Sequence, residues 1–313
     1  MAAADKELVV RQILPYLSPS VKNIILKLNE RHYAQMEEIR LRSGQPLILK
    51  IGDKDYTVNL SGRVENGLDN VYMVSAEDIY RTIASISDNS LYAFEEEIRR
   101  GFITVPGGHR AGLAGQVIVE GSQVRTIKDF SSICFRIARQ VENCANQVIS
   151  AVNPVGNNIL NTLIISPPRC GKTTFLRDIA RIISNCGQRN VVVVDERSEI
   201  AGCYRGIPQL DVGHRTDVLD ACPKALGMVM AVRSLSPQVI ITDEIGRSED
   251  VEAIQECINA GVTVISSVHA SNIRELGRRP IMKNMLQQNV FELGIVLSRR
   301  KGPGTVEELI RWD

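Results

Sequence analysis

The segment 166–174, which reads SPPRCGKTT, carries the residues best suited to chemistry in this sequence. It matches the phosphate-binding pattern GxxxxGK(S/T) except at the first position, where Ser166 replaces glycine. In such a loop, backbone N–H groups surround a triphosphate, a lysine reaches the β- and γ-phosphates, and a hydroxyl ligates Mg²⁺. The segment therefore predicts ATP and Mg²⁺ as ligands, with Lys172 and Thr173 in the last two roles. The expected nucleotide contacts are Ser166, Pro167, Pro168, Arg169, Cys170, Gly171, Lys172, Thr173 and Thr174.

Three other polar clusters follow short apolar runs later in the chain. Asp195 and Glu196 follow four valines. Asp243 and Glu244 follow the run VIIT, and His269 follows VTVISSV. These runs predict strands, and the ligand of an open parallel sheet lies beyond the carboxyl ends of its strands. We therefore expect all three clusters beside the phosphate loop.

The acids and the histidine have distinct expected roles in ATP hydrolysis. Asp243 would hold Mg²⁺ through water, and Glu244 would accept a proton from the attacking water. Asp195 and Glu196 lie at another strand end, where they would polarise water or contact the metal from the side. Two interpretations of His269 stay open, a sensor of the γ-phosphate or a hydrogen-bonded histidine at a strand end.

These side chains need a parallel sheet to position them. From residue 159 onward, short β-branched runs alternate with helical stretches, which predicts an α/β domain. The phosphate loop would join a strand at 163–165 to a helix, and further helices are expected at about 218–235 and 249–260. Because glycine usually serves the first loop position, we expect Ser166 to weaken nucleotide binding without abolishing it.

The first third of the chain predicts a smaller α+β domain. The segment 36–49 alternates apolar and charged residues, as in a small sheet, and the run from Ser75 to Asp78 predicts a capping box that begins a helix. His109 and Arg110 follow Pro-Gly-Gly and are interpreted as solvated turn residues. The alternative is that Arg110 reaches a nucleotide.

Length and composition limit the classes of function. The 313 residues suffice for about two domains, predicted as 1–138 and, after a boundary in an Asn- and Gln-rich stretch, the P-loop ATPase domain 139–313. Lys plus Arg (37) nearly balances Asp plus Glu (36), and aromatic residues make up only 4%, which disfavours direct binding of nucleic acid. The seven cysteines include no CxxC pair, which favours reduced thiols in a cytoplasmic protein. No apolar stretch approaches the length of a membrane span, so any membrane role is expected to come through partners.

The order of these clusters resembles the secretion-ATPase superfamily, the ring-forming P-loop motors of type II and type IV secretion and of pili. Its Walker A loop corresponds to 166–174, its Asp box to DERSE at 195–199, its Walker B box to IITDEIG at 240–246, and its His box to SSVHAS at 266–271. Four longer runs resemble the stage III sporulation protein AA family: SLYAFEEEIRRGFITVPGGHRAGLAG, DERSEIAG, VIITDEIGR and LSRRKGPGTVEE.

This resemblance implies a RecA-like P-loop fold and a cytoplasmic ATPase of endospore formation. Such a protein would be associated with the inner face of a membrane complex, where its partners would be channel proteins between mother cell and forespore. The superfamily also implies a homohexamer with nucleotide at the subunit interfaces, completed by an arginine of a neighbouring subunit. The candidates for that arginine, which the sequence does not rank, are Arg205, Arg215, Arg233 and Arg247.

Three functions are considered for a chain with these residues. The first is a motor that hydrolyses ATP with Lys172, Thr173, Asp243 and Glu244. The second is a nucleotide-dependent scaffold of the channel with little turnover, which the substitution at Ser166 suggests. The third, a translocase that acts on nucleic acid, is disfavoured by the balanced charge and scarce aromatic residues.

Overall fold

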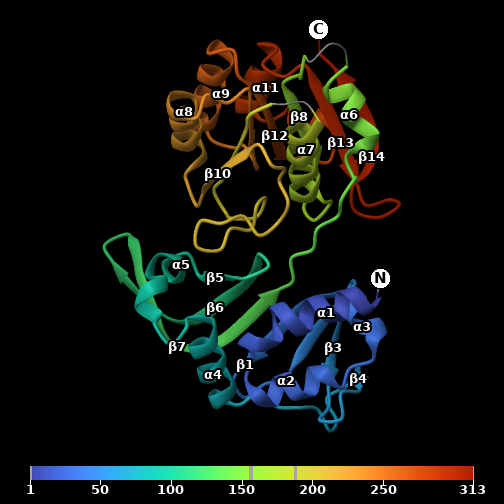
Figure 1. Ribbon diagram of the computed structural model, residues 1–313, viewed down its shortest axis with the longest axis vertical. Coiled ribbons are helices and arrows are strands. Elements are labelled where there is room, and N and C mark those ends of the chain that lie inside the picture. Colours follow the sequence, from blue (N-terminus) through green and yellow to red (C-terminus); the bar gives the residue numbers. More distant parts are fainter. Residues whose placement is uncertain (1, 155–157, 187–188, 313) are drawn as a thin grey trace. The chain divides into compact units, whose positions relative to one another are not determined.

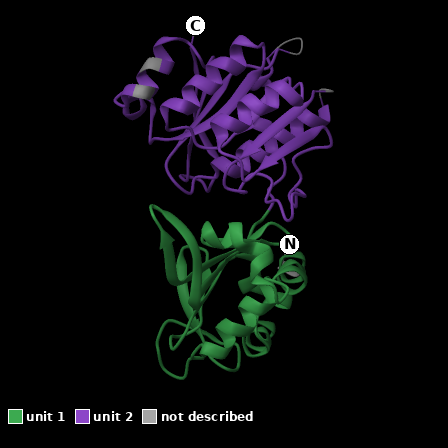
Figure 2. Cartoon of the chain, turned by 90° about the vertical axis from the view of Figure 1, so that its left-hand side faces the viewer, with its two compact units in different colours: residues 1–139 green, residues 140–313 purple. Residues whose placement is uncertain are grey.

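The computed structural model describes residues 2–154, 158–186 and 189–312 of the chain. The chain divides into two compact units, unit 1 (residues 1–139) and unit 2 (residues 140–313), each with its own seven-stranded sheet (Figure 2). Within the described ranges, no helix is both long enough and apolar enough to cross a membrane.

Unit 1 is built on an antiparallel sheet with the strand order β4-β3-β2-β1-β7-β6-β5. The strands are β1 (Met36–Arg42), β2 (Ile48–Ile51), β3 (Lys54–Val58), β4 (Val64–Glu65), β5 (Phe102–Val105), β6 (His109–Glu120) and β7 (Gln123–Arg136). The helices are α1 (Ala2–Gln12), α2 (Pro19–Leu26), α3 (Glu30–Ala34), α4 (Ala76–Ile86) and α5 (Glu95–Arg99), with short 3-10 helices η1 (Leu14–Tyr16) and η2 (Leu91–Phe94). The strands predicted near 36–49 are β1 and β2 of this sheet.

The start of α4 confirms the predicted capping box. The hydroxyl of Ser75 accepts a hydrogen bond from the backbone N–H of Asp78 at 3.1 Å, and the Asp78 carboxylate accepts one from the backbone N–H of Ser75 at 2.9 Å. These two bonds satisfy donors that the first turn of a helix leaves without partners. The same carboxylate also accepts from Ser18 and Tyr72, so the cap joins three segments of unit 1.

The interpretation of His109 as a solvated turn residue is wrong. His109 begins β6 and is fully buried. Its Nδ1 accepts the backbone N–H of Ala138 at 3.0 Å, and its Nε2 lies 2.8 Å from the side-chain oxygen of Gln12. Arg110 stacks over the ring of Phe102 within the same unit, 4.1 Å from the ring centre. These partners, Gln12 and Ala138, lie far from His109 in the sequence, so the local Pro-Gly-Gly pattern does not reveal them.

Unit 2 is an α/β layer structure around a sheet with the order β10-β9-β11-β12-β8-β13-β14. The strands are β8 (Thr162–Ser166), β9 (Val191–Asp195), β10 (Thr216–Asp220), β11 (Val239–Thr242), β12 (Thr263–His269), β13 (Leu293–Ser298) and β14 (Thr305–Arg311). The helices are α6 (Asn146–Val152), α7 (Lys172–Cys186), α8 (Lys224–Ser234), α9 (Ser248–Asn259), α10 (Ile273–Leu276) and α11 (Pro280–Gln287). All neighbouring strands are parallel except β14, which runs antiparallel to β13.

Helices cover both faces of this sheet (Figure 1). One apolar core joins residues of α6 and α7 to one face, including Val148 and Phe175. A second core joins residues of α8, α9 and α11 to the other face, including Met228 and Ile254. Because both faces are buried, the central strands are continuous apolar runs, as the four valines of β9 illustrate.

The helix expected at about 218–235 is shorter and begins later than predicted. Residues Thr216–Asp220 form the edge strand β10, and α8 begins only at Lys224. In β10, Val218 pairs with Val193 of β9. The segment forms a strand because it pairs with β9, although its apolar spacing also suits a helix. The predicted helix at 249–260 is present as α9.

Candidate nucleotide site

The phosphate loop lies between β8 and α7, at the carboxyl edge of the parallel sheet. Arg169 and Gly171 adopt positive φ angles of 61° and 88°, which turn the backbone into the first turn of α7. Pro167 and Pro168 have no N–H group, so the amides available to an anion are those from Arg169 onward. The positive end of the α7 dipole adds to their attraction for phosphate.

Ser166 is the fully buried last residue of β8. It does not belong to the residues with positive φ, so its backbone conformation makes no demand for glycine. Its hydroxyl donates to the carbonyl oxygen of Pro167 at 3.0 Å. Glycine is favoured at a loop position either by a positive φ or by close approach of a ligand, and only the second reason applies at Ser166. That Ser166 weakens nucleotide binding therefore stays a prediction.

Lys172, His269 and Glu244 form a continuous chain of polar contacts. Lys172 Nζ lies 2.6 Å from His269 Nδ1, and His269 Nε2 lies 2.9 Å from Glu244 Oε2. Because a charged lysine only donates, Nδ1 accepts the hydrogen bond from Lys172 and Nε2–H donates one to the Glu244 carboxylate. Burial lowers the pKa of Lys172 from its ordinary value, and the charge of Glu244 opposes this shift. The structure therefore brings together three residues that the sequence places on separate strand ends.

Lys172 also donates to the carbonyl oxygens of Ser166 and Pro167, at 3.4 and 3.3 Å. These carbonyl oxygens and His269 surround the ammonium group of Lys172, a residue that is largely buried. Phosphate oxygens would be stronger partners than backbone carbonyls, because they carry negative charge. The lysine is thus held at the loop by groups that a polyphosphate can replace.

A second cluster joins the ends of β9 and β11, which are neighbours in the sheet. The ammonium group of Lys224 lies 2.5 Å from Glu196 Oε2 and 3.3 Å from Asp243 Oδ1. Burial raises the pKa of Asp243 above its ordinary value, and the positive charge of Lys224 opposes this rise. Among the described residues, the Lys224 ammonium group is the ionic partner of the buried Asp243 Oδ1, although this contact does not have the geometry of a hydrogen bond.

Asp195 faces the backbone of its own loop. Its carboxylate accepts hydrogen bonds from the N–H groups of Glu199, Ile200 and Ala201 at 2.8 to 2.9 Å. The side chain is fully buried, and burial raises its pKa to about 6, against the opposing effect of these bonds. Both oxygens therefore accept hydrogen bonds from the segment 199–201 and hold its backbone in place.

Two residues of this region were absent from the sequence-based prediction. Lys224 opens α8 directly after Pro223, a position that the longer predicted helix concealed. Arg177, on the buried face of α7, donates to the carbonyl oxygens of Glu199 and Ile200 and so joins the phosphate-loop helix to the segment after Asp195. The only available signal for either was a charged residue at an otherwise apolar position.

The four candidate arginines for a neighbouring site are all exposed in unit 2. Arg215 bonds Asn190 at 2.9 Å, and Arg233 lies 3.8 Å from Glu256. Arg205 stacks on Tyr204, and Arg247 precedes α9. Their exposure is compatible with a contact to another subunit, but their contacts do not rank them.

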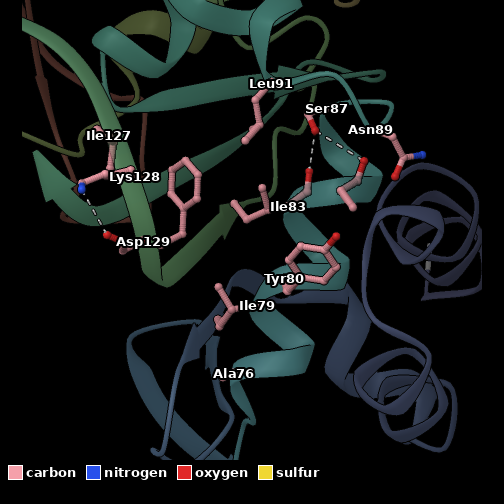
Figure 3. A pocket seen from close by; sticks show the side chains of 12 residues that line it. Ala76, Ile79, Tyr80, Ile83, Ser87, Asn89, Leu91, Ile127, Lys128 and Asp129 are labelled. Carbon is pink, nitrogen blue, oxygen red and sulfur yellow. Dashed lines mark hydrogen bonds and ion pairs between the residues drawn. The ribbon is translucent and has the colours of Figure 1, made fainter. Parts of the chain in front are cut away.

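Unit 1 contains an open pocket of about 440 Å³ (Figure 3). The pocket lies between one face of α4 and the strand β7, with Ile79, Tyr80 and Phe130 among its mostly apolar lining residues. At its border, Lys128 Nζ lies 3.8 Å from Asp129 Oδ2, so these two opposite charges form an ion pair. The charged residues that the sequence assigns to nucleotide chemistry lie in unit 2 instead.

The residues at the carboxyl edge of unit 2 fit ATP and Mg²⁺. The loop amides and Lys172 would hold phosphate oxygens, while Thr173, in the first turn of α7, and Asp243 would hold Mg²⁺. The chemistry of the donor set supports this assignment, because the Thr173 hydroxyl and the Asp243 carboxylate are the oxygen ligands that Mg²⁺ prefers, although Lys224 now lies 3.3 Å from Asp243 Oδ1.

The sequence profile of the family described as "Sporulation stage III, protein AA" matches residues 7–311. The chain belongs to this family. It is 44% identical over 310 residues to stage III sporulation protein AA of Bacillus subtilis (strain 168), a match that covers 97% of this chain and 96% of that protein.

Two solved structures resemble the chain in fold. The ATPase DotB of Legionella pneumophila gives a TM-score of 0.55 at 17% identity, over 85% of this chain and 73% of its own. The pilus retraction motor PilT with bound ADP gives 0.58 at 15% identity, over 96% and 83%. These similarities confirm the predicted RecA-like P-loop fold, here with two seven-stranded sheets of which one is mostly parallel. The chain is therefore a sporulation stage III homologue with the fold of secretion ATPases.

Proposed function

We propose that this protein is a Mg²⁺-dependent ATPase of endospore formation that powers or assembles a channel between mother cell and forespore. The contact chain from Lys172 through His269 to Glu244 carries the proposal. It joins the residue suited to hold a γ-phosphate to the residue suited to activate water. Unit 2 would be the ATPase domain, and unit 1 a separate domain.

In the proposed reaction, the loop amides and Lys172 bind the β- and γ-phosphates. The Glu244 carboxylate accepts a proton from the attacking water, and the Lys172 charge stabilises the oxygens that become more negative in the transition state. When bound through Thr173 and Asp243, Mg²⁺ supplies further positive charge to the phosphates. Asp195 positions the segment 196–201. Glu196 holds the ammonium group of Lys224, which in turn contacts Asp243.

His269 would report the state of the phosphate site to Glu244. With Lys172 bound to a γ-phosphate, His269 Nδ1 loses its donor and the ring is free to turn or to change tautomer. Because the other ring nitrogen holds Glu244, this change alters the orientation of the base. This favours the γ-phosphate sensor over the merely hydrogen-bonded histidine among the two readings of His269.

Assembly and location follow the family and the fold as proposals. We propose a homohexamer with nucleotide between subunits and one of Arg205, Arg215, Arg233 and Arg247 reaching the neighbouring site. The protein would act in the cytoplasm, bound peripherally to the inner face of a membrane complex through channel proteins, without direct contact to nucleic acid.

ATP hydrolysis by the purified chain tests the enzymatic proposal. Lys172→Ala should lose both ATP binding and turnover, whereas Glu244→Gln should bind ATP and lose turnover at least about a hundredfold. Glu249→Gln is the matched control, because Glu249 lies exposed in the first turn of α9. Equal rates for wild type and Glu244→Gln would contradict the assignment of the base.

A nucleotide-dependent scaffold with little turnover is the second candidate. Ser166 in place of glycine, together with a Glu244 already engaged by His269, favours it. Tight ATP binding without phosphate release, even with membranes of sporulating cells added, would support the scaffold. Release of phosphate that depends on Glu244 would decide for the enzyme.

A further inference from the structure

The strand order indicates in which direction a nucleotide would lie across the carboxyl edge of the sheet. Asp243 and Glu244 follow β11, and His269 is the last residue of β12. Both strands lie on one side of β8, and β13 is the neighbour of β8 on the other side. The γ-phosphate must point toward the groups that act on it. In the proposed site, the ribose and base at the far end of the nucleotide would then extend toward β13 and β14.

The turn between β13 and β14 lies directly on the phosphate loop. The backbone N–H of Gly304 donates to the carbonyl oxygen of Cys170 at 2.9 Å. A Cβ atom placed on Gly171 would lie 3.3 Å from the backbone nitrogen of Gly304, which is closer than most real contacts. Gly171 thus serves two needs, its positive φ and the close approach of this turn.

The turn is well fixed and carries positive charge. Thr305 Oγ1 donates to the carbonyl oxygen of Gly302 at 2.7 Å and accepts from the backbone N–H of Lys301 at 3.2 Å. Arg300 pairs with Glu307 at 3.0 Å. The three basic residues at 299–301 are exposed, so the turn offers cationic side chains to solvent beside the loop. The sequence run LSRRKGPGTVEE, which the proposed hydrolysis does not use, includes this turn.

We propose that the turn 299–304 is the wall of the nucleoside half of the ATP site, with Lys301 supplying charge near the phosphate closest to the ribose. This inference rests on the proposed ATP site. It assigns to the C-terminal hairpin a binding role that the phosphate-loop motif does not contain. The hydrogen bond from Gly304 to Cys170 supports this inference, because it holds the turn within one residue of the loop amides.

Photolabelling with 8-azido-ATP tests the position of the base. The peptide that contains 299–304 should carry the label in the full-length protein, and excess ATP should prevent it. Label that ATP displaces from other peptides only would overturn the inference while leaving the ATP site intact. No ATP-displaceable label anywhere, together with no ATP binding, would instead overturn the proposed function.

Lys301→Gln tests the charge. It should raise the Kd for ATP about fivefold, Lys301→Arg should restore affinity, and the effect should shrink as salt rises. Lys283→Gln, an exposed lysine of α11, is the control and should leave the Kd unchanged. Equal affinities of wild type and Lys301→Gln for ATP at low salt would show that the charge of Lys301 does not contribute to binding.

Discussion

Lys172 and His269 are in direct contact, with 2.6 Å between the lysine Nζ and the histidine Nδ1. They are 97 positions apart in the chain and meet because β8 and β12 are neighbouring parallel strands. The register pairs His269 with Ser166, the residue that begins the phosphate loop. The fold thus places an imidazole between the phosphate-binding lysine and Glu244.

Loss of the imidazole should uncouple phosphate binding from water activation. We expect His269→Ala to retain ATP binding within a few-fold and to lower steady-state hydrolysis at least about tenfold, because Glu244 loses the donor that orients it. His214→Ala is the control, since His214 is an exposed histidine of the same unit. An unchanged rate in His269→Ala would remove His269 from the mechanism.

The ion cluster around Lys224 should contribute to the stability of unit 2. Lys224→Met leaves Glu196 and the buried Asp243 without their cation, which we expect to lower the free energy of unfolding by roughly 3 kcal/mol. Lys224→Arg should lose much less, because the positive charge remains. Urea unfolding measures the difference, and Lys283→Met serves as the exposed control. If both methionine variants were equally stable, the cluster would have no energetic role.

Asp195 should act through the backbone of its loop. In Asp195→Asn, an amide group would oppose at least one of the N–H groups of Glu199, Ile200 and Ala201, at a cost of about 2 kcal/mol. The loss should appear in urea unfolding in the absence of nucleotide. Asp217→Asn, on the exposed side of β10, should be nearly neutral. A catalytic defect with unchanged stability would instead place Asp195 at the reacting groups.

His109 should make unit 1 less stable in acid. Burial, and secondarily the charge of Arg139, lowers the pKa of His109 to about 4, against about 6.5 in the unfolded chain. As pH falls through this window, the unfolded chain binds a proton that the folded unit excludes, so stability present above pH 6.5 is lost, by up to about 3 kcal/mol.

Unfolding of wild type and His109→Gln at pH 7 and pH 4.5 measures this effect. The wild type should lose more stability on acidification than the variant, because glutamine does not titrate. His214→Gln, at an exposed histidine, should follow the wild type. Parallel losses in wild type and His109→Gln would show that other groups cause the acid sensitivity.

Much of unit 2 could be predicted because its signals are local. A phosphate loop needs a strand, a turn and a helix in succession, and the polar residues after the apolar strands mark the edge where a ligand binds. The capping box of α4 was equally local, since both hydrogen bonds join residues three positions apart. The expected helix at 218–235 failed for the opposite reason, because strand pairing with β9 is a long-range effect.

The amino-acid sequence alone determined the P-loop class of this protein, its family and the residues that could do chemistry. Only the tertiary structure decided how those residues are partnered: Lys172 on His269, Lys224 between Glu196 and Asp243, Asp195 on its own loop, and the Gly304 turn on Cys170. The physical reason is that motifs record short-range backbone requirements. The order and register of the strands, by contrast, arise from burial of the whole sheet, and they set the distances between side chains far apart in the chain.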